Sequence, residues 1–268
     1  MESLEKQISD LVSQGYRLAF AQAKVAHDII LLAMDKCGFK DLSTIKGGVV
    51  MSHITNDMRR TTMDMDIAFI HYSLSDTSIT RFIQRLNCLP GINIAQFGMI
   101  AELRHEDYRG KRIYLDVVDQ SLKKPIRIKL DIGVHSYPEI DQIDYVFKLT
   151  DENEFAELLV NSNEQILTEK LLSLLRHRTL STRPKDIFDI YYLIDKINSQ
   201  KLNICFNTLI YANENIQPQN ISEIIAALTD VFSSRQFMRR LSAARANWLQ
   251  IDPAEATSKI IGFLRSLN

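Results

Sequence analysis

Apolar and polar side chains alternate along residues 62–70, which read Thr-Met-Asp-Met-Asp-Ile-Ala-Phe-Ile. The apolar side chains at 63, 65, 67 and 69 fall on one face of a strand, and Asp64 and Asp66 fall on the other. Upstream, residues 42–46 are typical of a short strand that enters a Gly47-Gly48 turn, and residues 49–54 of a helix. The pattern therefore predicts a strand, a glycine turn, a helix and a carboxylate-bearing strand.

The rest of the chain separates into a mixed half and a helical half. Alternation predicts further strands before Pro138, and a turn at 120–124 joins the last two into an antiparallel pair. From Asp151 onward the periodicity is helical and indicates no strand. We expect an α/β (α+β) protein with a small mixed sheet, in two domains at 1–150 and 151–268. The expected helices are 4–12, 17–37, 78–87, 164–177, one opened by residues 183–186, 204–213, 221–232, 235–249 and 254–267. The expected strands are 94–105, 112–118 and 125–135.

Composition narrows the class of protein without fixing its chemistry. The chain has 268 residues, 46% hydrophobic and 24% charged, and a net charge of −1, which argues against non-specific wrapping of nucleic acid but permits a local basic patch. Three distant cysteines form neither a zinc spacing nor a disulfide framework, which predicts a reducing cytoplasm. The charged N-terminus and the absence of an apolar run of about 18 residues predict no membrane association.

Asp64 and Asp66 repel each other on one strand face, and hard oxygen ligands at that spacing suit Mg²⁺. Gly47 and Gly48 leave backbone N–H groups free to approach phosphate oxygens at a helix start. Lys46, Arg59 and Arg60 add positive charge nearby. For Asp-x-Asp alone an exposed strand face is the better interpretation, but the glycine pair supplies the other half of a phosphate-and-metal site.

A third carboxylate is expected on the polar face of a later strand. Asp131 alternates with apolar residues in 126–134, and Asp116 does the same in 112–118. Alternation alone leaves Asp131 and Asp116 as rivals, and an exposed sheet position explains either one.

A second group of charged residues lies in the helical half. Glu169-Lys170 precedes Arg183-Pro184-Lys185-Asp186, which opens another helix. A carboxylate in a first helical turn is favoured by the helix dipole without any function, and a lone lysine is often solvated. Two basic clusters are compatible with a solvated surface or with an RNA backbone. They comprise Arg176, His177, Arg178, Arg183 and Lys185, and then Arg235, Arg239, Arg240 and Arg245.

Both groups together resemble the motifs of the AbiEii/AbiGii nucleotidyltransferase toxins of the DNA polymerase β-like superfamily. The first motif is Lys46-Gly47-Gly48, Arg59 or Arg60, Thr62 and Asp64-Met65-Asp66. The second is the Glu169-Lys170 helix followed by a basic-Asp-x-x-Asp helix at 183–189. The family usually has Thr or Ser after the glycine pair, where this chain has Val49. The missing hydroxyl would have to come from Ser52, Thr61 or Thr62.

The resemblance implies a polymerase β-like core that transfers a nucleoside monophosphate from a nucleoside triphosphate to an acceptor hydroxyl. It implies Mg²⁺, or Mn²⁺, as the metal, an RNA or tRNA acceptor, and a separate antitoxin as partner. A protein or small-molecule acceptor remains open, and so does a non-catalytic binding module, which Val49 favours. The implied metal ligands are Asp64, Asp66 and Asp131; the catalytic residues add Lys170 and Asp186; and the nucleotide-binding residues are Lys46, Gly47, Gly48, Arg59, Thr62 and Lys185.

Overall fold

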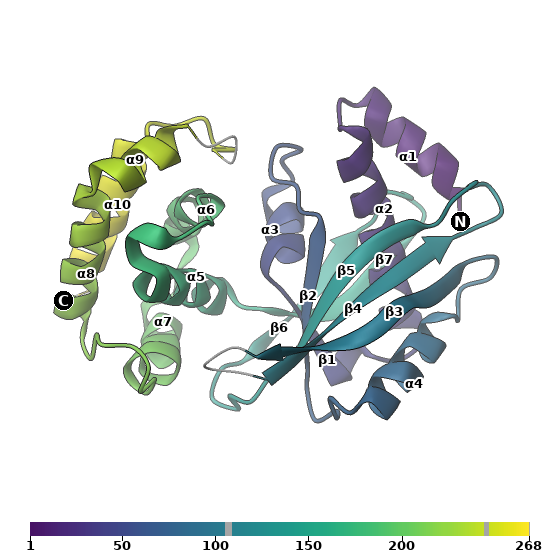
Figure 1. The fold of residues 1–268 in the computed structure, drawn as a ribbon, viewed down its shortest axis with the longest axis horizontal. Coiled ribbons are helices and arrows are strands. Elements are labelled where there is room, and N and C mark those ends of the chain that lie inside the picture. Colours follow the sequence, from purple (N-terminus) through teal and green to yellow (C-terminus); the bar gives the residue numbers. More distant parts are fainter. Residues whose placement is uncertain (105–108, 244–246, 268) are drawn as a thin grey trace. The chain divides into compact units, whose positions relative to one another are not determined.

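The computed structural model describes residues 1–104, 109–243 and 247–267, and these form two compact units (Figure 1). Unit 1 contains residues 1–138 and 142–161, and unit 2 contains residues 139–141 and 162–268. All strands of the described sheet belong to unit 1, and unit 2 is helical in its described part. Among the described residues, no helix is long and apolar enough to span a bilayer.

A seven-stranded mixed sheet forms the centre of unit 1, in the order β3-β4-β5-β2-β1-β7-β6. β2 pairs antiparallel with β1 and parallel with β5, so the predicted Asp-x-Asp strand lies in the interior of the sheet. The strands are β1 (Ser43–Lys46), β2 (Asp64–Phe69), β3 (Asn93–Arg104), β4 (Arg109–Val118), β5 (Ile126–Val134), β6 (Gln142–Lys148) and β7 (Phe155–Asn161).

Period-two alternation gives the central strands one apolar face and one polar face. Met65 and Ile67 on β2 are in register with Leu130 and Ile132 on β5, and all four side chains are buried. Helix α2 (Leu18–Lys36) packs on β7 and β5, behind the sheet in Figure 1, and α4 (Asp76–Leu86) packs on β3. The opposite face carries the charged side chains, and α3 (Gly47–Thr55) joins β1 to β2. Helix α1 (Leu4–Ser13) packs against α2.

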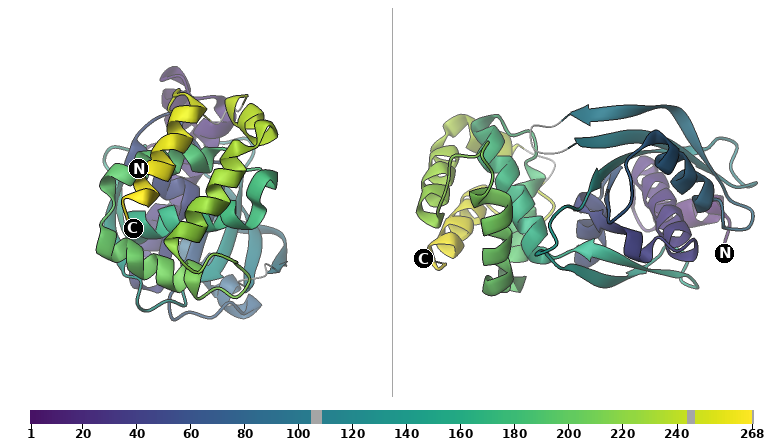
Figure 2. Two further views of the ribbon diagram at one scale, coloured as in Figure 1. Left: turned by 90° about the vertical axis from the view of Figure 1, so that its left-hand side faces the viewer. Right: turned by 90° about the horizontal axis from the view of Figure 1, so that it is seen from below.

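Unit 2 is a helical assembly with a core of aliphatic and aromatic side chains. Helix α5 packs on α6, α7 and α8, while α10 packs on α6, α8 and α9 (Figure 2). The elements are α5 (Asn163–His177), η2 (Arg178–Leu180), α6 (Lys185–Leu193), η3 (Ile194–Lys196), α7 (Ser199–Phe206), the π-helical turn η4 (Asn207–Tyr211), α8 (Ile221–Ser233), α9 (Arg235–Ser242) and α10 (Pro253–Arg265).

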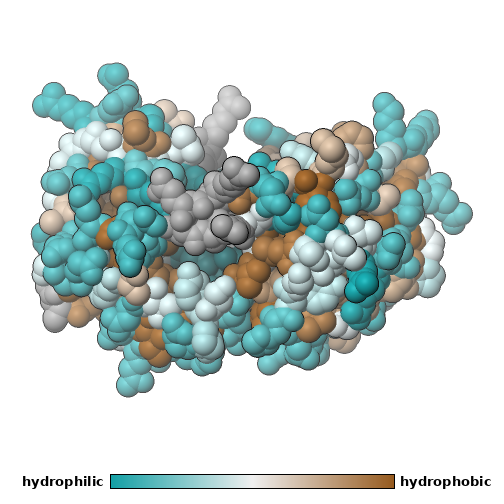
Figure 3. Space-filling view, turned by 60° about the horizontal axis from the view of Figure 1, so that its bottom comes forward, coloured by the Kyte–Doolittle hydropathy of each residue, from teal (hydrophilic) through white to brown (hydrophobic). Residues whose placement is uncertain are grey.

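The mixed α/β architecture predicted from the sequence is confirmed, with three local differences. Strands β6 and β7 occupy segments where no strand is predicted from the sequence. They form because β7 pairs parallel with the distant β1 and antiparallel with β6. The helix predicted at 235–249 ends at Ser242, and the one predicted at 204–213 is divided between α7 and a π-helical turn. Polar side chains cover most of the visible surface, with apolar ones in separate groups (Figure 3).

Candidate active site on the sheet of unit 1

One row of charged side chains crosses four adjacent strands on the polar face of the sheet. Asp66 on β2 is in register with Lys46 on β1 and with Asp131 on β5, and Asp131 is in register with Arg112 on β4. Paired positions on neighbouring strands lie about 5 Å apart and direct their side chains to the same face. The sheet therefore brings Lys46, Asp66, Asp131 and Arg112 together from segments up to 85 positions apart in the sequence.

Asp131 is bound by a bidentate arginine in this row. Arg112 donates from Nε to Asp131 Oδ1 at 2.7 Å and from Nη2 to Asp131 Oδ2 at 2.8 Å. These hydrogen bonds raise the pKa of Arg112 above its already high ordinary value, so the guanidinium group stays charged. The carboxylate of Asp131 is 18% exposed, which leaves it accessible from the polar face.

The next rows along the same face repeat the pairing of acid and base. Lys129 Nζ lies 2.6 Å from Asp64 Oδ2, and Arg127 Nε lies 2.8 Å from Asp116 Oδ1. Arg127 also stacks 3.2 Å from the centroid of the Phe97 ring. Asp116 is thus held on β4, with β5 between it and β2, whereas Asp131 is in register with Asp66. The structure places Asp131 beside the Asp64–Asp66 strand and places Asp116 away from it.

The glycine pair lies against this carboxylate row. Gly47 has φ +59°, and a Cβ atom added to it would lie 2.9 Å from Asp66 Oδ2. A Cβ atom on Gly48 would lie 2.6 Å from the Thr62 hydroxyl oxygen. Both positions therefore require glycine, and the backbone at the start of α3 closely approaches Asp66 and Thr62. Unpaired N–H groups of a helix start favour negative charge, so the site combines an anion-binding end with carboxylates.

Val49 does not leave this part of the site without a hydroxyl group. Its side chain is 1% exposed and packs in the core on the inner side of α3. Thr62 lies beside Gly48, and its hydroxyl donates to the Asp64 carbonyl at 3.2 Å. Ser52, Thr61 and Thr62 all line a small pocket with residues of α2, and Thr62 is the one of the three whose atoms lie nearest to Gly48. Of the three possible replacements, Thr62 is the one that the structure places at the glycine pair.

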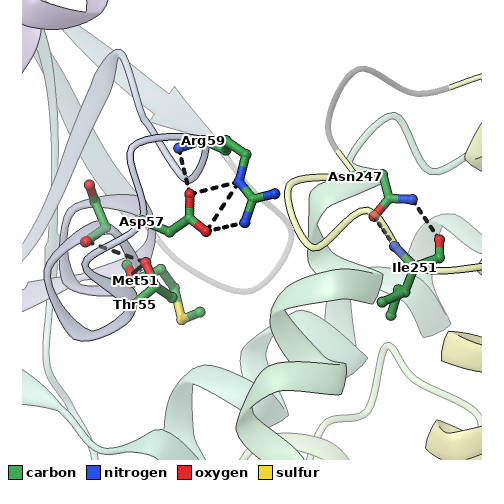
Figure 4. Close-up of polar contacts among 7 residues, drawn as sticks. Met51, Thr55, Asp57, Arg59, Asn247 and Ile251 are labelled. Atoms are coloured by element: carbon green, nitrogen blue, oxygen red, sulfur yellow. Dashed lines mark hydrogen bonds and ion pairs between the residues drawn. The ribbon is translucent and has the colours of Figure 1, made fainter. Parts of the chain in front are cut away.

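The predicted nucleotide-binding arginine is engaged elsewhere in this structure. Arg59 donates from Nη2 to Asp57 Oδ2 at 2.6 Å and from Nε to Asp57 Oδ1 at 2.9 Å (Figure 4). Hydrogen bonds from Arg59 lower the pKa of Asp57 below its ordinary value. Arg60 is 3% exposed, so it is not available at the surface. Lys46 is the one cation of the predicted first motif that lies in register with Asp66.

The donor set on this face fits a hard divalent cation, but its side chains are not gathered around a metal position. Among residues 1–104, 109–243 and 247–267, no group of three or more His, Cys, Asp or Glu side chains is arranged to hold a metal ion. Asp131 and Asp64 instead pair with Arg112 and Lys129. Carboxylate oxygens on adjacent positions of β2 and β5 are ligands of the kind that Mg²⁺ takes.

The predicted residues of unit 2 form a buried ion cluster. Lys170 Nζ on α5 lies 2.7 Å from Asp186 Oδ1 and 2.7 Å from Asp189 Oδ2 on α6. The exposed fractions of the three side chains are 11%, 10% and 0%. Trp248 Nε1 donates to Asp189 Oδ1 at 3.0 Å. The sequence predicts Lys170 and Asp186 as partners of one site, and the structure does bring them together; Asp189 joins them, and Lys185 is half-buried beside them at the start of α6.

A second buried cluster lies behind α3 and was not predicted from the sequence. Asp28 on α2 accepts hydrogen bonds from the Thr150 N–H at 2.8 Å and from the Thr150 hydroxyl at 2.6 Å, and it lies 3.1 Å from Lys24 Nζ. Burial works to raise the pKa of Asp28, but Lys24, His53 and Thr150 hold it well below its ordinary value. Burial lowers the pKa of the neighbouring His27 to about 4, and its Nε2 has no hydrogen-bond partner among the described residues.

Arg112 and Lys129 are the residues at the carboxylate row that the sequence did not identify as part of it. Each had a signal, because alternation places Arg112 and Lys129 on the polar faces of their strands. Their partners could not be read from the pattern, because pairing depends on the register between strands, and a shift of two residues would exchange one carboxylate for another.

Comparison with known proteins gives one family and one fold. The family model described as "Nucleotidyl transferase AbiEii toxin, Type IV TA system" matches residues 29–254. A proposed nucleotidyltransferase from Helicobacter pylori is 15% identical, with a TM-score of 0.50 over 93% of this chain and 94% of that one. JHP933 from Helicobacter pylori is 14% identical, with a TM-score of 0.50 over 93% and 91%.

A third solved structure, an antigenic nucleotidyltransferase-like protein from Paracoccidioides brasiliensis, is 17% identical, with a TM-score of 0.48 over 83% of this chain and 93% of that one. Comparison with curated proteins gives no significant match. At these identities the Helicobacter structures show a shared fold, and the family rests on the match to residues 29–254.

Proposed function

Because the chain belongs to the AbiEii family of nucleotidyl transferase toxins, we propose that it transfers a nucleoside monophosphate to an acceptor hydroxyl of RNA. A nucleoside triphosphate is the donor, pyrophosphate is the leaving group, and tRNA is the acceptor class that we propose. The toxin role implies a cognate antitoxin that controls this activity. The observation that supports the proposal most directly is the row that places Asp66 between Lys46 and Asp131, against the glycine pair.

The residues of this row have separate tasks in the proposed reaction. The backbone N–H groups at the start of α3 bind phosphate oxygens, which Gly47 and Gly48 permit because neither carries a side chain there. Lys46 neutralises phosphate charge from β1, and the Thr62 hydroxyl lies beside Gly48 as an additional hydrogen-bonding group. Positioning and charge stabilisation supply most of the rate enhancement in this class of chemistry.

Asp64, Asp66 and Asp131 are the residues that would hold Mg²⁺. Bound there, the metal would neutralise charge on the reacting phosphoryl group and lower the pKa of the acceptor hydroxyl. Asp131, the third carboxylate, would help to remove the proton of the acceptor hydroxyl. Lys170, Lys185 and Asp186 remain candidates for contact with the nucleotide, as the family resemblance implies.

The test is transfer of label from each of the four nucleoside triphosphates to total RNA, together with growth on induced expression. Asp66→Asn keeps the size of the side chain and removes its charge, so we expect a folded protein whose transfer rate falls by orders of magnitude. Asp116→Asn is the matched control, since Asp116 lies on the same face of the sheet but pairs with Arg127. It should stay within a few-fold of wild type.

The ion pairs on Asp64 and Asp131 are the observation that favours a second candidate, a non-catalytic binding module. Growth inhibition that persists in a folded Asp66→Asn protein would support that candidate. Wild-type protein that binds no nucleotide and labels no acceptor, with Mg²⁺ or Mn²⁺ present, would reject the transferase. Label on protein and not on RNA would keep the chemistry and change the acceptor.

A further inference from the structure

Two arginine-rich segments that are far apart in the sequence lie together in unit 2. Residues 176–185 and 233–243 contain neither Asp nor Glu. Helix α9 packs against η2, and the Arg240 guanidinium donates to the Thr179 carbonyl. We call Arg178, Arg235, Arg239 and Arg240 the arginine surface, and all four side chains are exposed. Arg245, predicted to belong to the second cluster, lies outside the described residues.

The charges of the arginine surface are not neutralised within the described part of the chain. None of its four guanidinium groups forms an ion pair with a described residue. Arg178 donates to Gln217 Oε1 at 2.8 Å, and Arg240 binds a backbone carbonyl, so both side chains are positioned by neutral groups. Arg112 and Arg127 on the sheet differ from these four arginines, because each of them forms an ion pair with an aspartate. The arginine surface therefore presents four positive charges to whatever approaches it.

Arg178 also occupies a backbone conformation that suits glycine. Its φ of +45° and ψ of −132° place it in a region that side chains with a Cβ atom rarely adopt. It directly follows α5, where a helix commonly ends on glycine. An arginine at such a position costs folding stability, and strained positions of this kind gather where a side chain has a task.

Helix α9 also carries arginines at positions that are unfavourable for helix stability. Arg235 is its first residue, where the helix dipole disfavours a positive charge. Arg235 and Arg239 are four residues apart, so their like charges lie on one side of the helix, while Phe237 and Leu241 are buried on the other. Three unfavourable placements on one surface indicate that its arginines are retained for binding and not for folding.

We propose that the arginine surface binds the phosphate backbone of the RNA that the proposed transferase uses as acceptor. Guanidinium groups bind phosphate oxygens in a bidentate manner, and backbone contacts position a nucleic acid without reading its sequence. A protein partner needs an apolar centre to its interface. Among the described residues of the arginine surface and the elements that carry it, Leu180 is the one large apolar side chain that is exposed. A polyanion fits better, and this assignment rests on the proposed function.

The test measures binding in the absence of nucleoside triphosphate, with the full chain and a labelled RNA hairpin that has a single-stranded 3′ end. We expect Arg178→Gly with Arg235→Gln and Arg239→Gln to weaken binding at least about tenfold, and the dependence of log Kd on log salt to become shallower by about two to three. Arg178→Gly alone should weaken binding while leaving the thermal midpoint unchanged or higher, because glycine accepts the backbone conformation.

Arg265→Gln is the matched control, because Arg265 is exposed in the last turn of α10, as Arg239 is in the last turn of α9. It should bind like wild type. Unchanged RNA affinity of the folded triple variant would overturn the proposal, as would displacement of the RNA by a polyglutamate peptide at equal charge concentration, which would indicate an acidic protein partner. Transfer to RNA that persists with the triple variant at wild-type KM would reject the surface but keep the transferase. Surface-dependent binding without transfer would reject the transferase and keep the surface.

Discussion

The carboxylate row of unit 1 and the ion cluster of unit 2 contain the same kinds of groups in opposite surroundings. Asp64 and Asp131 pair with Lys129 and Arg112 on an open sheet face, where the four side chains are 18% to 49% exposed. Lys170, Asp186 and Asp189 pair where none exceeds 11%. A charge on the sheet can exchange its partner for solvent or a ligand, whereas a charge in the helical cluster has no such alternative.

This difference in burial determines how much an ion pair contributes to the stability of the fold. Removing one partner of a buried pair leaves a desolvated charge and costs much of the stability of a domain, whereas an exposed pair contributes little. The two regions share a family resemblance at the sequence level, but burial gives Lys170 a structural task whether or not it also contacts a nucleotide. The half-exposed row has no comparable structural reason to hold three carboxylates, which is why we place the chemistry there.

The largest expected effect comes from Lys170→Met, which takes the Lys170 ammonium group away from the buried Asp186 and Asp189. We expect unit 2 to lose about 3–5 kcal/mol of unfolding free energy. Trp248, the one tryptophan of the chain, donates to Asp189, so its fluorescence in a urea titration reports this cluster directly.

The matched control is Lys129→Met, which removes the cation from an exposed aspartate on the sheet. Its cost should not exceed about 1 kcal/mol. Equal costs for the two lysines would show that burial does not distinguish the regions and would remove the basis of the comparison.

A smaller effect tests whether the contrast follows burial or follows the unit, because His27 is buried in unit 1. Burial lowers its pKa to about 4, so between pH 6.5 and 4 the unfolded chain takes up the proton and the folded protein does not. The contribution of neutral, buried His27 to the unfolding free energy is therefore complete above pH 6.5 and is lost as the pH falls to 4. The loss amounts to about 3 kcal/mol at most.

His27→Leu should abolish that part of the pH dependence. The measurement is urea unfolding by circular dichroism at pH 6.5 and pH 4, taking the transition that leaves Trp248 fluorescence unchanged as that of unit 1. The lowered pKa of Asp28 affects stability only where an ordinary carboxyl group takes up its proton, so by pH 4 it adds only about 0.3 kcal/mol to the loss. An identical loss in the variant would mean that His27 is protonated in the folded state at pH 4 or titrates normally.

The sequence was most informative where a local pattern determines the structure. Alternation on 63–70 predicts that Asp64 and Asp66 share the polar face of a strand, and the structure has both on β2 with the glycine pair at the start of α3. The resemblance favours Asp131 over Asp116, and Asp131 lies in register with Asp66 because β5 pairs parallel with β2. Which residues coordinate a metal or a nucleotide remains a prediction.

What the sequence could not supply depends on pairing between distant segments. Strand β7 is formed by pairing with β1 across more than a hundred residues, and its own pattern does not distinguish it from a helix start. The bidentate ion pair between Arg112 and Asp131 depends on the register of β4 against β5. The joining of two arginine segments depends on α9 packing against η2. Periodicity describes one element at a time, so none of these contacts is visible in it.

The smallest expected effect concerns the competition for Asp131. Arg112→Gln removes the bidentate cation from a partly exposed pair, so the unfolding free energy should change by no more than about 1 kcal/mol. The released carboxylate should bind a divalent cation more tightly, by about two- to fivefold, since the competing pair is worth less than one factor of ten. Titration of Mn²⁺ followed by electron paramagnetic resonance measures the Kd without any turnover.

Two further variants decide what that titration means. Arg127→Gln is the control, because Arg127 makes the same kind of pair with Asp116, which lies on β4 and is separated from β2 by β5. The Mn²⁺ Kd of this variant should equal that of wild type. Asp131→Asn should weaken Mn²⁺ binding, since it removes a proposed ligand. If Asp131→Asn binds Mn²⁺ as wild type does, Asp131 is a partner of Arg112 and not a metal ligand. If Asp131→Asn weakens Mn²⁺ binding while Arg112→Gln leaves it unchanged, Asp131 binds the metal without releasing Arg112. Exposure of the carboxylate row would then not mean that its ion pairs exchange for ligands.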